Sequence, residues 1–349
     1  MEAEVMMEGP PMVHPIPHSL FDSADMGSQA ALAMWKDSMD AIYDVRLCAD
    51  QAVFRARAEA FHFGEVVLTA YRCLAQTFDR SRSRIGRDGV DHYTLQFCLS
   101  GRHGSRDGAR DGEAGPGDLI IADLAQPHAT ATSDFDSLNL TVPRRLLAPL
   151  LHAPHAQCLR LISGSAPLVG LFRNHLIGLF AAAPAINVEE AEALVPPTLA
   201  LAAAVLNMDA PQNALQVVDP LLTAQIHRLI SDRAADPAIT AESVAEWFGI
   251  SRRKLYYLME PHGGFTACVR ERRLHLAHAM LRDPLQSGKS VAEIAERCGF
   301  AWRTNFARSF RARFGVTPRE ARALAGQHAL RSQGDLTERH MWEWIQMLR

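Results

Sequence analysis

Basic, amide and hydroxyl side chains recur at helical spacing in two short segments in the second half of the chain. Residues 298–310, CGFAWRTNFARSF, combine phenylalanines with Arg303, Thr304, Asn305 and Arg308. Residues 251–259, SRRKLYYLM, carry Arg252, Arg253, Lys254, Tyr256 and Tyr257. An arginine fits the two acceptors of guanine, and an amide fits the donor and acceptor of adenine. These side chains are therefore candidates for hydrogen bonding to base edges and phosphates.

The two segments belong to an internal duplication. VAEWFGISRRKL (244–255) and IAERCGFAWRTNF (294–306) place Gly249 over Gly299, at an offset of 50 residues. Each copy predicts a short helix, a glycine suited to a left-handed turn and a second helix. This is the pattern of a helix-turn-helix, in which the N-terminal residues of the second helix meet base edges in the major groove.

Apolar side chains in the same segments should hold these helices against a core. The inward positions are Leu255, Leu258 and Met259 in the first unit, and Phe300, Phe306 and Phe310 in the second. Residues 290–293 and 317–320 match the capping box that fixes the start of a short helix. The apolar-striped segment 266–281 predicts a long helix that joins the two units.

Charge is distributed unevenly along the chain. Residues 219–325 contain 17 Lys and Arg against 11 Asp and Glu, a net charge of +6, and the chain total of −3 leaves −9 for the remainder. A basic module joined to an acidic one is typical of a nucleic-acid-binding domain attached to a partner domain that meets no phosphate. For any single one of these charges, a solvated helix face without function is the competing interpretation.

Upstream, the sequence predicts a β-sandwich or small barrel followed by helices. Between residues 53 and 142, short apolar runs such as YTLQFCL alternate with polar residues and are separated by turn sequences. Beyond Pro143, apolar residues recur at three- and four-residue spacing, which predicts helices. The helices over 165–208 either complete this first domain or form a dimer interface.

The C-terminal region, about 219–325, closely resembles the DNA-binding domain of AraC/XylS-type transcription regulators. The motifs that carry the resemblance are VAEWFGISRRKLYYL, RERRLHLAHAML, VAEIAERCGF and FARSFRARFGVTPRE. The resemblance implies two helix-turn-helix subdomains on adjacent major-groove segments, with recognition helices over 252–257 and 303–308 and a connecting helix over 270–281. Met259 and Pro261 depart from the family pattern, so the first recognition helix should end early; Trp302 stands where an acidic residue is usual.

The upstream region resembles the cupin-like sensor domain of AraC-type regulators of aromatic amine or alkylbenzoate catabolism. The residues that carry this are His92, Tyr93, Gly101, the turn at 116–118, Pro127, Pro143 and Arg144. The resemblance implies a small-molecule effector, double-stranded DNA, RNA polymerase and a second copy of the chain as partners. Because the matching residues are mostly turn and scaffold residues, they indicate the fold and leave the effector unidentified.

Cupins often hold a metal through clustered histidines, which makes a cupin-type enzyme with a helical appendage one alternative. His92, His103 and His128 lack the H-x-H spacing of such a site, and no phosphate-loop or hydrolase motif occurs. The six cysteines stand far apart, and no long apolar or signal-like segment is present. We therefore expect no catalytic residue, metal or cofactor, and a cytoplasmic protein with reduced cysteines that spans no membrane.

The sequence thus predicts a two-domain α+β protein, with a cupin-like β-barrel and an all-α DNA-binding domain. The expected segments are a flexible arm (1–30), a sensor and dimerisation domain (31–206), a linker (207–216), an AraC-type DNA-binding domain (217–325) and a C-terminal tail helix (326–349). The expected function is an effector-responsive activator of catabolic genes; the alternative within the same class is a constitutive regulator or repressor without an effector. One side of the tail helix should dock on this chain or on another subunit, through Trp342, Trp344, Ile345 and Leu348.

Overall fold

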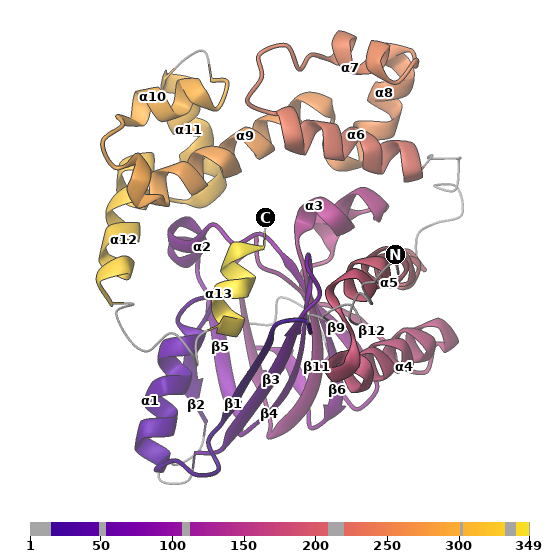
Figure 1. Ribbon diagram of the computed structural model, residues 1–349, viewed down its shortest axis with the longest axis vertical. Helices are drawn as coiled ribbons and strands as arrows, with labels where there is room; N and C mark the ends of the chain where they lie inside the picture. Colours follow the sequence, from indigo (N-terminus) through magenta and orange to yellow (C-terminus); the bar gives the residue numbers. More distant parts are fainter. Residues whose placement is uncertain are drawn as a thin grey trace, which may run out of the picture.

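The predicted two-domain architecture is confirmed. A computed structural model describes residues 15–48, 54–106, 112–208, 220–300, 303–331 and 340–348. It contains a β-rich N-terminal domain and, above it in Figure 1, an all-helical C-terminal domain. A final helix, α13 (His340–Met347), returns from the helical domain to the β-rich one. Most of the predicted linker lies outside the described residues, so its boundaries stay a prediction.

Two antiparallel sheets form the N-terminal domain. The seven-stranded sheet has the order β1-β3-β4-β11-β6-β9-β12, and the five-stranded sheet has the order β2-β5-β10-β7-β8. The strands of the first are His18–Asp22, Ala56–His62, Val67–Cys73, Phe135–Val142, Tyr93–Ser100, Leu119–Asp123 and Arg160–Ile162, in that order. Those of the second are Asp44–Leu47, Gln76–Arg80, His128–Thr132, His103–Ser105 and Glu113–Ala114. Short helices α1 (Ser28–Met39), α2 (Arg82–Asp88) and α3 (Arg144–Leu147) connect or flank them.

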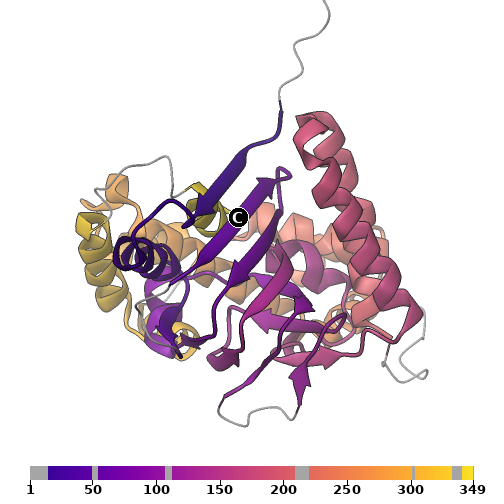
Figure 2. The ribbon, with the colours of Figure 1, turned by 90° about the horizontal axis from the view of Figure 1, so that it is seen from below.

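The alternation in β6 explains how the large sheet is covered on both faces. Tyr93, Leu95 and Phe97 are buried on one face against helices α4 (Pro167–Ala182) and α5 (Val188–Leu206). Thr94 and Gln96 point to the other face, where they line a cavity between the sheets. In Figure 2, α4 and α5 stand together along one side of the strands, opposite α1.

Helices α4 and α5 therefore complete the sensor core, which was one of the two expectations for residues 165–208. Pro167–Ala185 is the one segment of the described chain long and apolar enough to span a membrane, with a mean hydropathy of 1.3. Phe172 and Leu176 of this segment are nevertheless packed in the sensor core. Leu171 and Ile177 remain exposed, so a dimer interface on this face stays a prediction.

The expectation of a flexible arm reaching residue 30 is wrong from residue 15 onward. His18–Asp22 form β1, which pairs antiparallel with β3 at the edge of the large sheet. Ser19 and Phe21 point inward and their neighbours point outward. Two buried positions after a proline-rich stretch are too short an alternation to predict a strand. The strand is fixed by pairing with residues about forty positions away, which the local pattern does not encode. Residues 1–14 lie outside the described part of the chain.

The C-terminal domain consists of two small helical cores joined by one helix, as predicted. Its helices are α6 (Pro220–Arg233), α7 (Ala241–Trp247), α8 (Arg252–Met259), α9 (Phe265–Arg282), α10 (Val291–Arg297), α11 (Arg303–Phe314) and α12 (Pro318–Arg331). One core lies around α6, α7 and α8, and the other around α10, α11 and α12. Helix α9 contributes Val269 to the first core and Leu274, Ala277 and Leu281 to the second, so it fixes the two units relative to each other.

Three buried histidines are held in their neutral form. Burial lowers the pKa of His103 and His262 to about 4 and that of His278 to about 3. Because a histidine in the unfolded chain has a pKa of about 6.5, unfolding below that pH takes up protons that the folded chain does not bind. Above about pH 6.5 these histidines should therefore leave the free energy of unfolding undiminished. We expect it to fall by about 1 kcal/mol per histidine for each pH unit below that value, measured by urea denaturation.

One variant isolates this effect. Replacing His278 by glutamine should make the pH dependence of stability shallower, because one buried neutral histidine is then removed. Equal stability at about pH 7.5 and about pH 5.5 would contradict the assignment of these histidines as neutral.

Candidate nucleic-acid interface and ligand cavity

The first helix-turn-helix unit presents a polar face on α8. Gly249 takes the left-handed conformation, with φ of 62°, and Ser251 caps α8 by accepting a hydrogen bond from the Lys254 amide at 3.1 Å. Leu255, Leu258 and Met259 are fully buried, as predicted. The remaining candidates point outward or are half-buried; they are Arg252, Arg253, Lys254, Tyr256 and Tyr257.

Helix α8 ends early, as the sequence predicts. It covers Arg252–Met259 and gives way to a 3-10 turn at Glu260–His262, after which Gly263 adopts a φ of 82°. Arg252 pairs with Glu242 of α7 at 2.9 Å, and both side chains are more than half exposed. An exposed pair of this kind contributes little stability, so phosphate could replace Glu242 as the partner of Arg252 at small cost.

The second unit is built in the same way around α11. Ser290 and Glu293 form the predicted capping box at the start of α10. Gly299 has a φ of 82°, and a Cβ there would lie 2.8 Å from the Arg273 guanidinium carbon, so glycine is required at this turn. Phe306 and Phe310 are buried and Phe300 is half-buried, which confirms the predicted inward face.

The outward face of α11 carries Asn305 and Arg308, both exposed. The Arg308 guanidinium donates a hydrogen bond to the Asn305 side-chain oxygen at 2.9 Å, so the two groups lie together. Arg303 and Thr304 belong to the first turn of α11, but their side chains lie outside the described residues. Trp302 also lies outside them.

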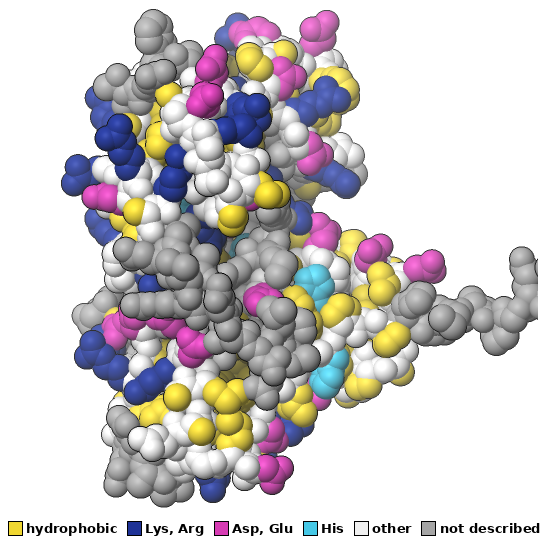
Figure 3. Space-filling model, turned by 60° about the vertical axis from the view of Figure 1, so that its left-hand side comes forward, with side chains coloured by type: hydrophobic (Ala, Val, Ile, Leu, Met, Phe, Trp, Pro, Cys, Tyr) yellow, Lys and Arg dark blue, Asp and Glu magenta, His cyan; other side chains and the backbone are white. Residues whose placement is uncertain are grey.

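Both units open onto one groove of about 720 Å³. Tyr256 of α8 lines it together with Asn305 and Arg308 of α11, so the structure brings part of the two predicted sets together. Arg253 and Tyr257 line a separate, shallower hollow beside α8. Figure 3 shows Lys and Arg side chains spread over the helical domain, at the top of that view.

Arg270 is a groove residue that the sequence did not single out. It is exposed on α9 and lines the same groove as Tyr256 and Arg308. The motif RERRLHLAHAML contains it, but the helical pattern alone does not distinguish it from the neighbouring arginines. Arg273, one turn further, instead donates to the carbonyls of Ala234 and Gly299 at 2.6 and 2.8 Å and holds the domain together.

Helix α2 of the sensor forms one of the contacts with the DNA-binding domain; α6 also packs on α3 and on the 3-10 turn Ala148–Leu150. His278 of α9 donates a hydrogen bond to the Gly86 carbonyl at 2.7 Å, and α11 and α12 pack on the same helix. A Cβ on Gly86 would lie 2.6 Å from the Phe314 carbonyl oxygen and from Val316, so the two domains approach as closely as glycine permits. In Figure 1, α2 lies directly beneath α9 and α11.

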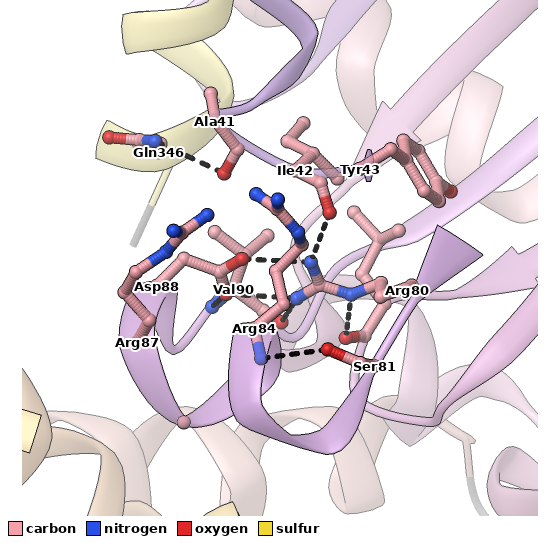
Figure 4. Close-up of polar contacts among 12 residues, drawn as sticks. Ala41, Ile42, Tyr43, Arg80, Ser81, Arg84, Arg87, Asp88, Val90 and Gln346 are labelled. Carbon is pink, nitrogen blue, oxygen red and sulfur yellow. Dashed lines mark hydrogen bonds and ion pairs between the residues drawn. The ribbon is translucent and has the colours of Figure 1, made fainter. Parts of the chain in front are cut away.

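A buried arginine anchors α2 to the barrel. Arg80 is fully buried, and its guanidinium binds both carboxylate oxygens of Asp88 at 2.8 and 2.9 Å (Figure 4). The remaining donors bind three backbone carbonyls, those of Leu124, Ile42 and Val90, at 2.6, 2.7 and 2.9 Å. All five N–H groups of Arg80 are thus used, so the charge is compensated and the end of α2 is fixed.

A small cavity of about 60 Å³ lies between the two sheets. Its walls are mainly aromatic and aliphatic, and no Lys, Arg, Asp or Glu is among the described residues that line it. The buried polar groups there include His103, whose two ring nitrogens find no hydrogen-bond partner in the described structure, and the unpaired amide oxygen of Asn139. Such unpaired groups are costly unless a ligand or water binds them.

The three histidines considered for a metal site are divided between two places. His103 and His128 line the cavity, whereas His92 donates a hydrogen bond to the Ile345 carbonyl of α13 at 2.7 Å. Within the described ranges, no three His, Cys, Asp or Glu side chains are grouped closely enough to hold a metal. All six cysteines are free thiols, and Cys48 is exposed rather than in the core.

Comparison with known proteins finds matches to both domains. Residues 244–323 match the family described as a helix-turn-helix domain, and residues 39–207 match the family described as an AraC-binding-like domain. Over 304 residues the chain is 25% identical to the transcriptional activator NphR of Rhodococcus sp. This alignment covers 81% of this chain and 86% of NphR.

Two further relatives match over shorter regions. YpdC of Escherichia coli, an uncharacterized HTH-type transcriptional regulator, is 35% identical over 143 residues, or 40% of this chain and 46% of YpdC. The XylDLEGF operon transcriptional activator of Pseudomonas putida is 39% identical over 82 residues, or 23% of this chain and 26% of that protein. Both alignments span less than two thirds of the relative. Among solved structures, the AraC-like transcriptional activator CuxR matches the fold with a TM-score of 0.54 at 24% identity, covering 80% of this chain and 100% of CuxR.

Proposed function

Since this chain belongs to the AraC/XylS family of transcription regulators and carries a cupin-like sensor domain, we propose that it activates transcription by binding a specific DNA sequence. The observation that carries the proposal is the groove shared by the two helix-turn-helix units. Tyr256 from one unit and Asn305 and Arg308 from the other open onto the same groove, so a single duplex can meet both.

The proposed DNA contacts come from both helix-turn-helix units. Base edges would be met from α11 by Asn305 and Arg308, together with Arg303 and Thr304 of its first turn. Base edges and phosphates would also be met by the α8 candidates, which are Arg252, Arg253, Lys254, Tyr256 and Tyr257. Arg270 joins the set because it lines the groove between the units.

Replacing Arg308 by alanine, or Arg303 by alanine, is expected to weaken binding to the preferred duplex by about 1–3 kcal/mol and to relax the base preference at one position. The reason is the loss of a guanidinium that can bind two guanine acceptors. A binding-site selection from random duplexes, followed by titration at a fixed salt concentration, measures both effects.

The control for this test is Arg297, an exposed residue at the end of α10, outside the proposed contacts. Its replacement by alanine should leave the selected sequence unchanged. If the Arg308 or Arg303 variant selects the same sequence as the parent chain, that residue does not contact bases.

Footprinting should also show two protected major-groove segments separated by about one helical turn, roughly 34 Å.

The cavity between the sheets is the proposed effector site. It is lined mainly by apolar side chains and supplied with unpaired polar groups at His103 and Asn139, which is the usual chemistry of a small-molecule site. An effector-responsive regulator should change its affinity for the duplex when one compound of a candidate panel is added. A constitutive regulator or repressor would show the same affinity throughout, and this panel separates the two.

The remaining partners follow from the same proposal. We propose a homodimer that uses the exposed apolar face of α4, at Leu171 and Ile177, and that contacts RNA polymerase at the promoter. Because it acts on DNA, we place the protein in the cytoplasm. The family consists of regulators rather than enzymes, so a cupin-type enzyme is not our proposal.

A further inference from the structure

The C-terminal helix α13 closes the cavity of a domain that is far from it in the sequence. Trp342 and Ile345 line the cavity wall, and both are buried, with 6% and 3% of their surface exposed. Met341 and Leu348 join the same core cluster as Trp35 and Phe54. The sequence left two alternatives for this helix, and in this structure it docks on its own chain.

Trp342 occupies a slot made by aromatic rings. Its indole lies 6.4 Å from the Trp35 ring at 83° and 6.1 Å from the Tyr71 ring at 33°. These are the edge-to-face and tilted arrangements that aromatic rings prefer. A flat ring that entered this slot would therefore find the same contacts that the indole now makes.

The size of the cavity shows that α13 and a ligand compete for space. With Trp342 and Ile345 in place, the cavity of about 60 Å³ has room for a few water molecules. Pockets that bury small organic ligands usually measure several hundred Å³. A ligand with a ring and a polar substituent can enter only when these two side chains leave.

The lining also indicates the charge of such a ligand. No charged side chain lines the cavity in the described chain, and burial lowers the pKa of His103 to about 4, so this histidine is neutral near pH 7. A carboxylate would lose its hydration without gaining a counter-charge, which is costly. A neutral group that both donates and accepts hydrogen bonds would satisfy His103 and the Asn139 oxygen.

A short segment links α13 to the DNA-binding domain. His92 donates its hydrogen bond to the Ile345 carbonyl, and the adjacent Asp91 lies 3.4 Å from His275 of α9. Although burial opposes it, the neighbouring His275, His92 and Arg144 hold the pKa of Asp91 well below its usual range, so this carboxylate stays ionised. His275 lies beside Glu271, which binds Arg313 of α11.

A second connection passes through the loop after α1. Gln346 of α13 donates to the Ala41 carbonyl at 3.3 Å, and the next carbonyl, that of Ile42, accepts from Arg80 (Figure 4). Arg80 in turn fixes α2, on which the DNA-binding domain docks. Departure of α13 would thus remove contacts on both routes to α9 and α11.

Resting on the proposed function, we propose that α13 is a built-in competitor of the effector. A neutral aromatic molecule takes the place of the Trp342 side chain, and its entry releases α13 and loosens the docking of the DNA-binding domain. The slot around Trp342, His103 and Asn139 is then the effector site, and the C-terminal helix is the part of the chain that responds to its occupancy.

The full-length chain with Trp342 replaced by alanine tests this proposal, with indole as the probe. The variant should bind indole at least tenfold more tightly than the parent chain, because the parent must first expel its own indole group. Calorimetric titration measures both affinities. Indole-3-carboxylate, which has the same ring with an anionic group, should bind the variant at least tenfold more weakly than indole does.

The matched control is Trp344→Ala on the same helix. Trp344 packs against His62 outside the cavity wall, so this variant should bind indole as the parent does. A chain ending at residue 331, which lacks α13, replaces the Trp342 variant if the latter does not fold. Equal indole affinity in the parent, the Trp342 variant and the shortened chain would show that Trp342 does not compete with the ligand. Equal affinity of the Trp342 variant for indole and for indole-3-carboxylate would show that the site does not select neutral ligands.

A titration with the selected duplex tests the link to DNA. The Trp342 variant without indole, and the parent with saturating indole, should both bind the duplex at least fivefold more tightly than the parent alone. Unchanged duplex affinity in both cases would refute the release mechanism while leaving DNA binding intact. If no form of the chain prefers any duplex sequence, the proposed function fails. The indole titrations would still test whether Trp342 competes with a ligand, because they do not involve DNA.

Discussion

Replacing Arg80 by methionine is expected to lower the free energy of unfolding by about 3–5 kcal/mol. The substitution leaves the buried Asp88 carboxylate without its guanidinium and three backbone carbonyls without a donor. Because Asp88 ends α2, the DNA-binding domain should also lose part of its docking site. Urea denaturation, followed separately by fluorescence and by circular dichroism, measures the loss.

Two controls separate the buried charge from the general effect of losing an arginine. Replacing Arg72, which is 77% exposed in its pair with Asp136, should change stability by less than about 1 kcal/mol. Adding Asp88→Asn to the Arg80 variant should restore part of the loss, since the uncompensated carboxylate is then gone. An Arg80 variant as stable as the Arg72 variant would show that the buried network contributes little.

Replacing Gly86 by alanine is expected to weaken the docking of the two domains at α2, and so to favour their separation, without unfolding either one. The new methyl group would lie 2.6 Å from the Phe314 carbonyl oxygen, and backbone at that position cannot move aside as a side-chain end could. Within α2 itself alanine is the better helix former, by about 1 kcal/mol, so the sensor alone should tolerate it. The overlap should cost the docked state about 1–3 kcal/mol.

Small-angle scattering and hydrogen exchange detect this separation. The radius of gyration should rise, and amides of α2 and α9 at the interface should exchange faster, while the two helix-turn-helix cores keep their protection. Gly170→Ala is the matched control, because this glycine is also helical and a Cβ there meets nothing within 4 Å. Unchanged scattering and exchange in the Gly86 variant would mean that the interface can adjust to a methyl group.

The helical domain was the part most fully predicted from sequence. Its glycine turns, capping boxes and inward faces involve residues within about one turn of one another, so local periodicity encodes them. The burial of Phe306 and Phe310 and the left-handed Gly299 follow directly from that pattern. The first half of the chain was predicted only as a class of fold, because alternation indicates strands and does not state which strands pair.

The contacts that join distant parts of the chain could not be predicted in this way. Strand β1 depends on pairing with β3, and Arg80 depends on carbonyls from three loops. Nothing local distinguishes Arg80 from an exposed arginine of a strand, or Arg270 from the other arginines of α9. These assignments arise only when folding brings together groups that are far apart in sequence.

The sequence by itself determined that this chain carries two helix-turn-helix units on a basic domain and which side chains those units can offer to DNA. The tertiary structure decided that the units share one groove, that α2 docks the domain, and that Trp342 closes a cavity lined by residues up to about 300 positions earlier. The physical reason is that helix faces are set by neighbours along the chain, whereas cavities and interfaces are set by packing between elements.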